Sequence, residues 1–163
     1  NFYNNYIIKK IDKMSISNNI NYLISIRSSN DEVNRRKTGM FKNRKDIIDL
    51  SSKYKFIELD TSKLPLMDNI NMFMKLKIVI IESGAGITNL LWCHPETIVI
   101  VLQTLHRCKV ADKSMNIKGY GPYNDICKKF KHLYVVSCGN SNSEENVNAN
   151  IDKLRLVLNK IFM

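Results

Sequence analysis

Short, continuous apolar runs alternate with longer amphipathic segments along most of this chain. The apolar runs predict buried strands at residues 22–26, 56–59, 78–81, 97–102 and 133–136. Between them, apolar residues recur three and four positions apart, which is the helical spacing. This spacing predicts helices over residues 1–14, 43–54, 64–76, 87–93, 124–130 and 147–162.

The predicted strands are almost wholly apolar instead of alternating between apolar and polar residues. Strands of that kind are buried on both faces, as in a parallel sheet covered by helices. Their alternation with helices predicts a Rossmann-like α/β domain, a parallel sheet with helices on both faces. We expect residues 1–20 to form a lead-in helix and linker, and residues 21–163 to form the domain. Asn43 is expected to cap the helix that follows it, and Pro95 to end the helix before the fourth strand.

Composition supports an ordinary globular domain. The 163 residues are 44% hydrophobic and 25% charged, close to the averages for such domains. No apolar run approaches the roughly 20 residues of a membrane helix. The first residues show neither an initiator Met nor a signal-peptide pattern, so we expect the chain to be part of a longer protein whose other lobe is missing.

Charge adds a hint about partners. The net charge of +10 predicts anionic partners without saying which. Between Glu32 and Asp46 there is no acidic residue, whereas six basic residues crowd together there: Arg35, Arg36, Lys37, Lys42, Arg44 and Lys45. A solvated basic loop and a phosphate-binding loop fit this stretch equally well.

The four cysteines are too scattered for a disulfide scaffold. They predict reduced thiols and a cytoplasmic location, with a secretory lumen or a virus-associated setting as alternatives. Cys93 and Cys127 lie in patterns typical of small buried positions. A zinc site built from Cys93, His94, His106 and Cys108 is disfavoured because the spacing lacks the close cysteine pair of structural zinc motifs. We expect no metal site and no cofactor.

The segment from Glu82 to Gly86 is the strongest candidate for chemistry. It follows an apolar strand, and ligands of open parallel sheets bind at the carboxyl ends of the strands. Gly84 and Gly86, on either side of Ala85, allow a tight turn and the close approach of a ligand. The helix that follows presents free N–H groups that suit a phosphate, and Thr88 and Asn89 add a hydroxyl and an amide. A plain strand-to-helix turn is the alternative.

Arg27 strengthens the case for an anionic ligand. It ends the first predicted strand and so lies at the same edge as Gly84, and the loop with Arg35 and Arg36 follows it. Guanidinium groups that converge on a helix N-terminus suit a diphosphate. A surface ion pair with Asp60 is the alternative for Arg27.

The predicted site is therefore one for a nucleotide diphosphate. Its residues are Arg27, Arg35, Arg36, Ser83, Gly84, Ala85, Gly86, Thr88 and Asn89. Neither a Walker motif nor a dinucleotide motif is present, since the latter would need a glycine in place of Asn89.

These motifs resemble the C-terminal half of glycosyltransferase family 61. Members of that family carry a strand that ends in arginine, a downstream arginine pair and an asparagine, then a strand that leads into G-A-G-[LI]-T-N-L-L-[FW]. Here the pattern appears as Ile26-Arg27, Arg35-Arg36, Asn43 and the run from Gly84 to Trp92, with Pro95 behind it. The closing segment, Asn150-Ile151-Asp152, is also similar to the family's ending.

The resemblance implies one lobe of a GT-B fold, the C-terminal lobe that binds a nucleotide-sugar donor for transfer to a glycan or protein acceptor. It implies that Arg27 and Arg36 neutralise the diphosphate and that Ser83 to Gly86 lie beneath it. It implies no bound metal, because basic residues and a helix dipole stabilise the leaving group. The catalytic base would come from the missing N-terminal lobe, and no residue of this chain is assigned to catalysis.

Two positions depart from the family pattern. Ser83 stands where the family usually has histidine, and Val101 where it usually has a glutamate suited to ribose hydroxyls. Glu82 and Glu96 are the candidates to replace that carboxylate. The departures keep a second function open, a non-catalytic lobe that serves as an interaction module. A third, nucleic-acid binding, depends only on the net charge and the basic loop, and we expect no nucleic-acid partner.

Overall fold

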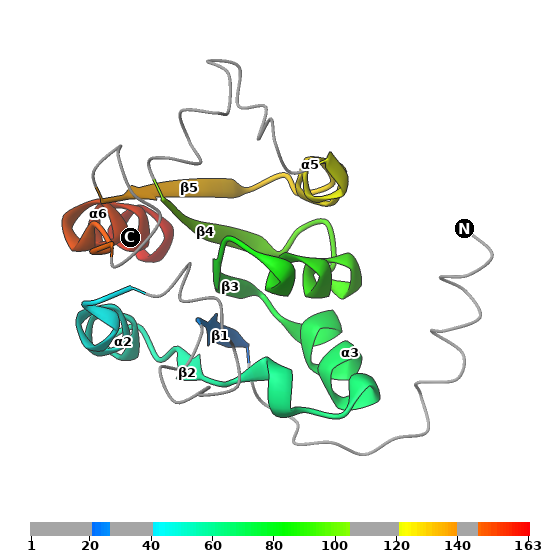
Figure 1. Cartoon of the computed structure of the whole chain (residues 1–163). Helices are drawn as coiled ribbons and strands as arrows, with labels where there is room; N and C mark the ends of the chain where they lie inside the picture. Colours follow the sequence, from blue (N-terminus) through cyan, green and yellow to red (C-terminus); the bar gives the residue numbers. More distant parts are fainter. Residues whose placement is uncertain (1–20, 27–40, 105–120, 140–146) are drawn as a thin grey trace.

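Five parallel strands form one twisted sheet in the order β2-β1-β3-β4-β5 (Figure 1). The computed structural model describes residues 21–26, 41–104, 121–139 and 147–163. The strands are β1 (Tyr22–Ser25), β2 (Ile57–Glu58), β3 (Ile78–Glu82), β4 (Ile98–Thr104) and β5 (Leu133–Cys138). All five predicted strands are present, and the prediction of a Rossmann-like α/β fold is confirmed.

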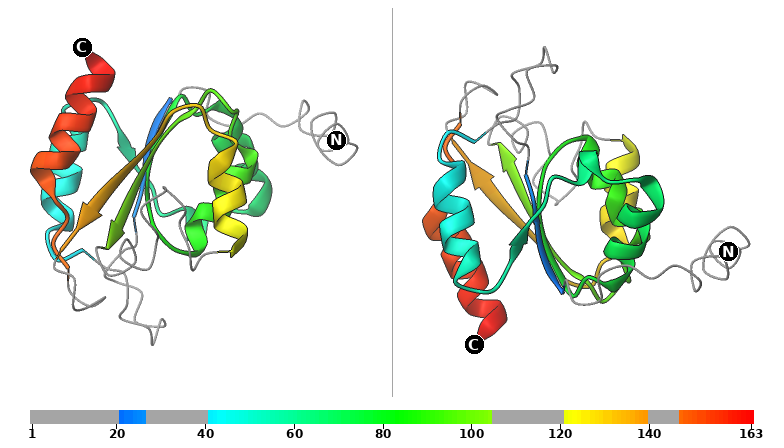
Figure 2. Two further views of the ribbon diagram at one scale, coloured as in Figure 1. Left: turned by 90° about the horizontal axis from the view of Figure 1, so that it is seen from above. Right: turned by 90° about the horizontal axis from the view of Figure 1, so that it is seen from below.

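Helices cover both faces of the sheet, which stands between the two helix layers when viewed from above or below (Figure 2). One layer consists of α2 (Arg44–Ser52) and α6 (Ile151–Phe162). The other consists of α3 (Leu66–Lys75), the 3-10 helix η2 (Ala85–Trp92) and α5 (Gly121–Lys128). A short 3-10 turn, η1 (Thr61–Lys63), connects β2 to α3.

Two apolar cores result, one on each side of the sheet. Successive side chains of a strand point to opposite faces. Ile80 therefore packs under α2 and α6, while its neighbours Val79 and Ile81 pack under α3, η2 and α5. Every residue of β3 is buried, which explains why its sequence shows no polar alternation.

The helices α2 and α3 begin and end within two residues of their predicted limits, whereas η2, α5 and α6 differ from the prediction in form or by a larger shift of the first residue. The predicted helix over residues 87–93 is a 3-10 helix that already begins at Ala85. The helix predicted over 124–130 begins at Gly121, since proline is tolerated in a first helical turn and Pro122 does not delay it.

The last helix begins at Ile151 instead of Val147. Val147 is used in an isolated parallel bridge to Phe41, and Asn150 caps the helix by accepting a hydrogen bond from the Lys153 N–H at 3.0 Å. The helix predicted over 1–14 lies outside the described residues.

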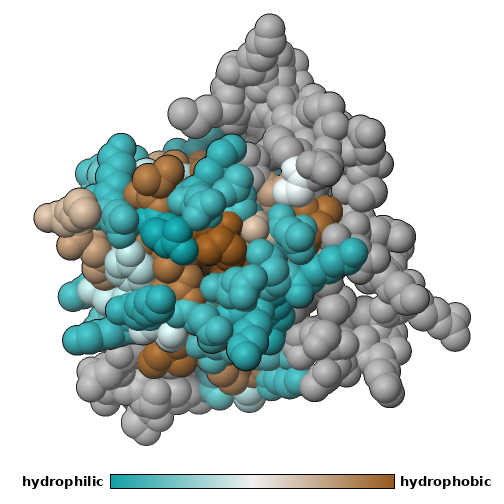
Figure 3. All heavy atoms as spheres, turned by 90° about the vertical axis from the view of Figure 1, so that its left-hand side faces the viewer, coloured by the Kyte–Doolittle hydropathy of each residue, from teal (hydrophilic) through white to brown (hydrophobic). Residues whose placement is uncertain are grey.

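The outer surface over α2 and α6 is mostly hydrophilic, with separate apolar areas between the polar side chains (Figure 3). Leu156 of α6 is an exposed apolar residue, 69% accessible. The longest helix in the described part of the chain has 12 residues, and no helix there has both the length and the apolar character to cross a bilayer.

Candidate functional site

The strand order reverses between β1 and β3. The chain leaves β1 towards β2 on one side, and it leaves β3 towards β4 on the other side. Such a switch point opens a crevice at the carboxyl ends of the two strands, where doubly wound sheets bind their ligands. The register pairs Ser25 with Ile81, so both strands end at the same level. The Ser83–Gly86 segment follows directly from β3, at this switch point.

Buried polar residues gather at the carboxyl ends of β3 and β4. Glu82 and Ser83 are 7% and 6% exposed, and Gln103 on β4 is 2% exposed. Strand residues before them are apolar, and burial of polar side chains is costly unless they have partners or a function. Gln103 is not among the site residues predicted from the sequence, although its polar side chain directly follows the apolar run 97–102.

The turn after β3 directs backbone donors towards this edge. Gly84 is fully extended (φ 159°, ψ −160°), and its carbonyl accepts the Ile87 N–H at 3.0 Å to start η2. The N–H groups of Ala85 and Gly86 precede the first helical hydrogen bond and have no backbone acceptor in the described part of the chain. The turn therefore offers the N–H donors and the positive helix end that an anion requires.

Packing does not explain why Gly86 is a glycine. A Cβ added there would meet Ile81 Cδ1 at 3.8 Å, an ordinary van der Waals contact among the described residues. Gly139, after β5, is different: its φ is +75°, and an added Cβ would lie 2.0 Å from Val147 Cγ1. Among the described residues, local structure requires glycine at 139 but not at 86.

The first turn of η2 places the two polar residues selected from the sequence near this edge. Thr88 is exposed, and its hydroxyl donates to the Ala85 carbonyl at 2.7 Å. Asn89 is partly exposed. The Thr88 hydroxyl is thus used to stabilise the turn, and only its lone pairs are left for a ligand.

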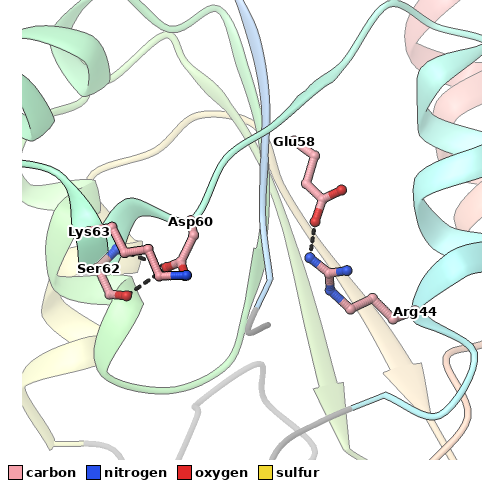
Figure 4. A network of polar contacts seen from close by, with 5 residues as sticks. All are labelled: Arg44, Glu58, Asp60, Ser62 and Lys63. Atoms are coloured by element: carbon pink, nitrogen blue, oxygen red, sulfur yellow. Dashed lines mark hydrogen bonds and ion pairs between the residues drawn. The ribbon is translucent and has the colours of Figure 1, made fainter. Parts of the chain in front are cut away.

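Beside β1, polar contacts order the segment after β2. The hydroxyls of Ser25 and Thr61 are hydrogen-bonded at 3.1 Å. Asp60 accepts a hydrogen bond from the Ser62 hydroxyl at 2.6 Å and forms an ion pair with Lys63, and the Ser62 bond is the main reason why its carboxyl pKa lies below the usual value (Figure 4). The alternative that Arg27 pairs with Asp60 is untested, because Arg27 lies outside the described residues.

Two long-range contacts join the starts of α2 and α6. Asn43 Nδ2 donates to the Ala149 carbonyl at 3.0 Å, and Asn43 Oδ1 accepts from the Ala149 N–H at 2.7 Å. Asn43 does occupy the N-cap position of α2, but its side chain makes no cap hydrogen bond, so that part of the prediction is wrong. Arg44, the first residue of α2, pairs with Glu58 of β2 (Figure 4).

Of the basic stretch, Arg44 and Lys45 lie in the first turn of α2, and the described residues on either side of residues 27–40 both lie in the core beneath α2 and α6. Ile26 is 5% exposed and Phe41 is 7% exposed. The arginines predicted for the site, Arg27, Arg35 and Arg36, lie between them and outside the described residues.

His94 and Glu96 lie at the opposite edge of the sheet. They connect η2 to the amino end of β4, both are exposed, and His94 Nδ1 accepts the Glu96 N–H at 3.2 Å. Glu96 also pairs with Lys131. Glu96 therefore cannot replace the missing carboxylate near the turn, which leaves Glu82 as the candidate.

The end of η2 is held by α5. Lys129 Nζ donates to the carbonyls of Leu91 and Cys93 at 2.8 and 2.9 Å, and partial burial lowers the pKa of this lysine. Burial raises the pKa of the Cys93 thiol to about 12, so the thiol stays protonated at neutral pH. Cys93 and Cys127 are buried, as predicted. No group of His, Cys, Asp or Glu residues in the described ranges has an arrangement that would hold a metal ion.

Val101, at the position of the family glutamate, is completely buried in the core under α3, η2 and α5. Its neighbours across the sheet are Ile81 and Val135. At this position the side chain contributes to packing.

A doubly wound parallel sheet with a glycine-containing turn at its switch point defines the class, an α/β protein with a Rossmann-like fold. The sequence profile of the glycosyltransferase 61 family matches residues 2–100, more than half of the chain. The chain therefore belongs to glycosyltransferase family 61, and the resemblance seen in the sequence is confirmed. The comparison with curated proteins finds no match.

Proposed function

We propose that this chain is the donor-binding lobe of a glycosyltransferase, which holds a nucleotide-diphosphate sugar for transfer to a glycan or protein acceptor. The observation that carries the proposal is the position of the Ser83–Gly86 turn at the carboxyl end of β3, where the strand order reverses. The N–H groups of Ala85 and Gly86 supply two donors for the diphosphate.

The register of β1 and β3 supports the inclusion of Arg27 in this site. Ser25 pairs with Ile81. Arg27 follows Ser25 by two residues, as Ser83 follows Ile81. We propose that Arg27, together with Arg35 and Arg36, neutralises the diphosphate and stabilises it as a leaving group without a metal ion.

The catalytic base belongs, in this proposal, to a second lobe outside the chain. An interaction module without catalysis is the second candidate, and Ser83 and Val101 favour it because both depart from the family pattern. The two candidates differ in one measurable property, the affinity for a nucleoside diphosphate.

The test is calorimetric titration of the chain with UDP, GDP and their sugar conjugates, with Arg27→Ala as the comparison. We expect one nucleotide to bind, and the loss of one bidentate contact to weaken its affinity about tenfold or more.

Absence of binding at millimolar ligand, both for this chain and for a longer protein that contains it, would favour the interaction module. Equal affinity in Arg27→Ala would remove Arg27 from the site while leaving the donor-lobe proposal intact.

A further inference from the structure

Gln103 is a neutral amide in an unusual place. Its side chain is 2% exposed, and its Nε2 has no hydrogen-bond partner among the described residues. An unpaired buried amide costs free energy that an apolar residue of the same shape would not. Val99 and Val101, earlier on the same face of β4, are apolar. The packing of the strand therefore gives no reason for an amide at position 103.

The sheet places this amide next to the anion-binding turn. Val101 faces α3, η2 and α5, and Gln103 faces the same way because it follows two residues later. The Ser83 N–H donates to the Leu102 carbonyl at 2.9 Å, so the β3–β4 ladder continues past Glu82 and brings Ser83 beside Gln103.

A side chain at position 86 would face the same side of the sheet as Gln103. An added Cβ there would point at Ile81, which belongs to the same core cluster as Val101. Among the described residues, a glycine without a packing reason and an amide nitrogen without a partner thus occur together at one corner of the switch point. Both are explained if a ligand is bound there.

We propose that Gln103 is a further donor-binding residue, whose Nε2 donates a hydrogen bond to an oxygen of the ligand's diphosphate at the Ser83–Gly86 turn. The inference rests on the proposed function. An uncharged N–H donor suits this place, because it adds a contact to the phosphate without burying a charge. In this proposal the amide reaches the ligand from the end of β4, since only Thr104 follows Gln103 in that strand.

The test compares Gln103→Met with Asn71→Leu. Methionine keeps the length of the side chain and removes the N–H group that would donate the hydrogen bond. Asn71 of α3 is the matched control, because it too is buried (5% exposed) with its amide atoms unpartnered among the described residues, but it is not on the switch-point edge. UDP and GDP are the probes, with affinities from calorimetry at a temperature at which both variants are folded and melting temperatures from scans without ligand.

We expect Gln103→Met to melt at the same or a higher temperature and to bind the nucleotide about 10- to 100-fold more weakly, as for the loss of a hydrogen bond to a charged group. Asn71→Leu should keep the affinity. Unchanged affinity in Gln103→Met overturns the inference alone, whereas absence of nucleotide binding by the parent chain overturns the proposed function as well. If Gln103→Met does not fold, Gln103→Asn replaces it. Asparagine is shorter by one methylene, which moves the amide N–H away from the ligand, and we again expect weaker nucleotide binding.

Discussion

Gly86 and Gly139 lie at the carboxyl edge of the sheet, and each lacks a side chain for a different physical reason. Gly139 has a left-handed backbone conformation and touches Val147, so its lack of a side chain serves the fold. Gly86 has room for a methyl group within the described structure. The sequence alone presents both simply as glycines after apolar strands.

Replacement of Gly86 by alanine should therefore separate stability from binding. We expect Gly86→Ala to leave the free energy of unfolding equal or raise it by about 0.4–1 kcal/mol, because alanine restricts the unfolded chain and favours the helix. The added methyl group should weaken UDP or GDP binding at least about tenfold, since it occupies the approach of the diphosphate. Denaturant unfolding and calorimetry measure the two quantities.

Gly139→Ala is the matched control. Its methyl group would overlap Val147, so we expect a loss of about 1–3 kcal/mol in the free energy of unfolding and an unchanged nucleotide affinity of the folded fraction. A Gly86→Ala variant that loses stability but binds normally would assign Gly86 to the fold and remove it from the site.

At the scale of elements, the segments before α2 and α6 fix each other although they are far apart in the sequence. Phe41 and Val147 form a parallel bridge, and the Asn43 side chain bonds both backbone groups of Ala149. An asparagine before an amphipathic run predicts a helix cap from local chemistry. In the structure the Asn43 amide instead bonds to Ala149, which lies 106 residues further along the chain.

Asn43→Ala should destabilise the domain by about 2–4 kcal/mol, because it removes two hydrogen bonds and leaves the N–H and the carbonyl of Ala149 without these partners. Chemical denaturation with a tryptophan or circular dichroism signal measures the change. Asn43→Asp retains the acceptor for the Ala149 N–H and should lose about half as much. A loss below about 0.5 kcal/mol in Asn43→Ala would show that water replaces the amide without cost.

At the scale of the whole molecule, the net charge of +10 attracts any polyanion. The salt dependence of the affinity distinguishes this general attraction from binding at a specific site. A nucleotide at the switch point makes few phosphate contacts, so we expect its affinity to fall by no more than about tenfold between 50 and 200 mM salt, against about 10³-fold or more for a protein that makes six or more contacts to DNA.

Fluorescence anisotropy with duplex DNA checks the comparison. We expect a dissociation constant no tighter than the non-specific range of about 10⁻⁶ to 10⁻⁴ M at 150 mM salt. Tighter binding with a steep salt dependence would support the nucleic-acid alternative.

The sequence by itself determined the strands, the α/β class and the location of the turn. These follow from local properties: continuous apolar runs such as 78–81 are buried in any parallel sheet, and glycines after a strand produce a turn wherever that strand lies. The residues of the turn were also predicted, since backbone donors at a helix start need no distant partner. Glu96 was a wrong candidate because the sequence shows a nearby carboxylate but not the edge of the sheet at which it lies.

Only the tertiary structure decided which residues meet. The 3-10 form of η2, the start of α6 at Ile151 and the contact between Asn43 and Ala149 depend on packing and on hydrogen bonds between distant segments. Gln103 became a candidate for the same reason. Its place beside Ser83 follows from the register of β3 against β4, and register is a relation between two strands that neither strand carries in its own sequence.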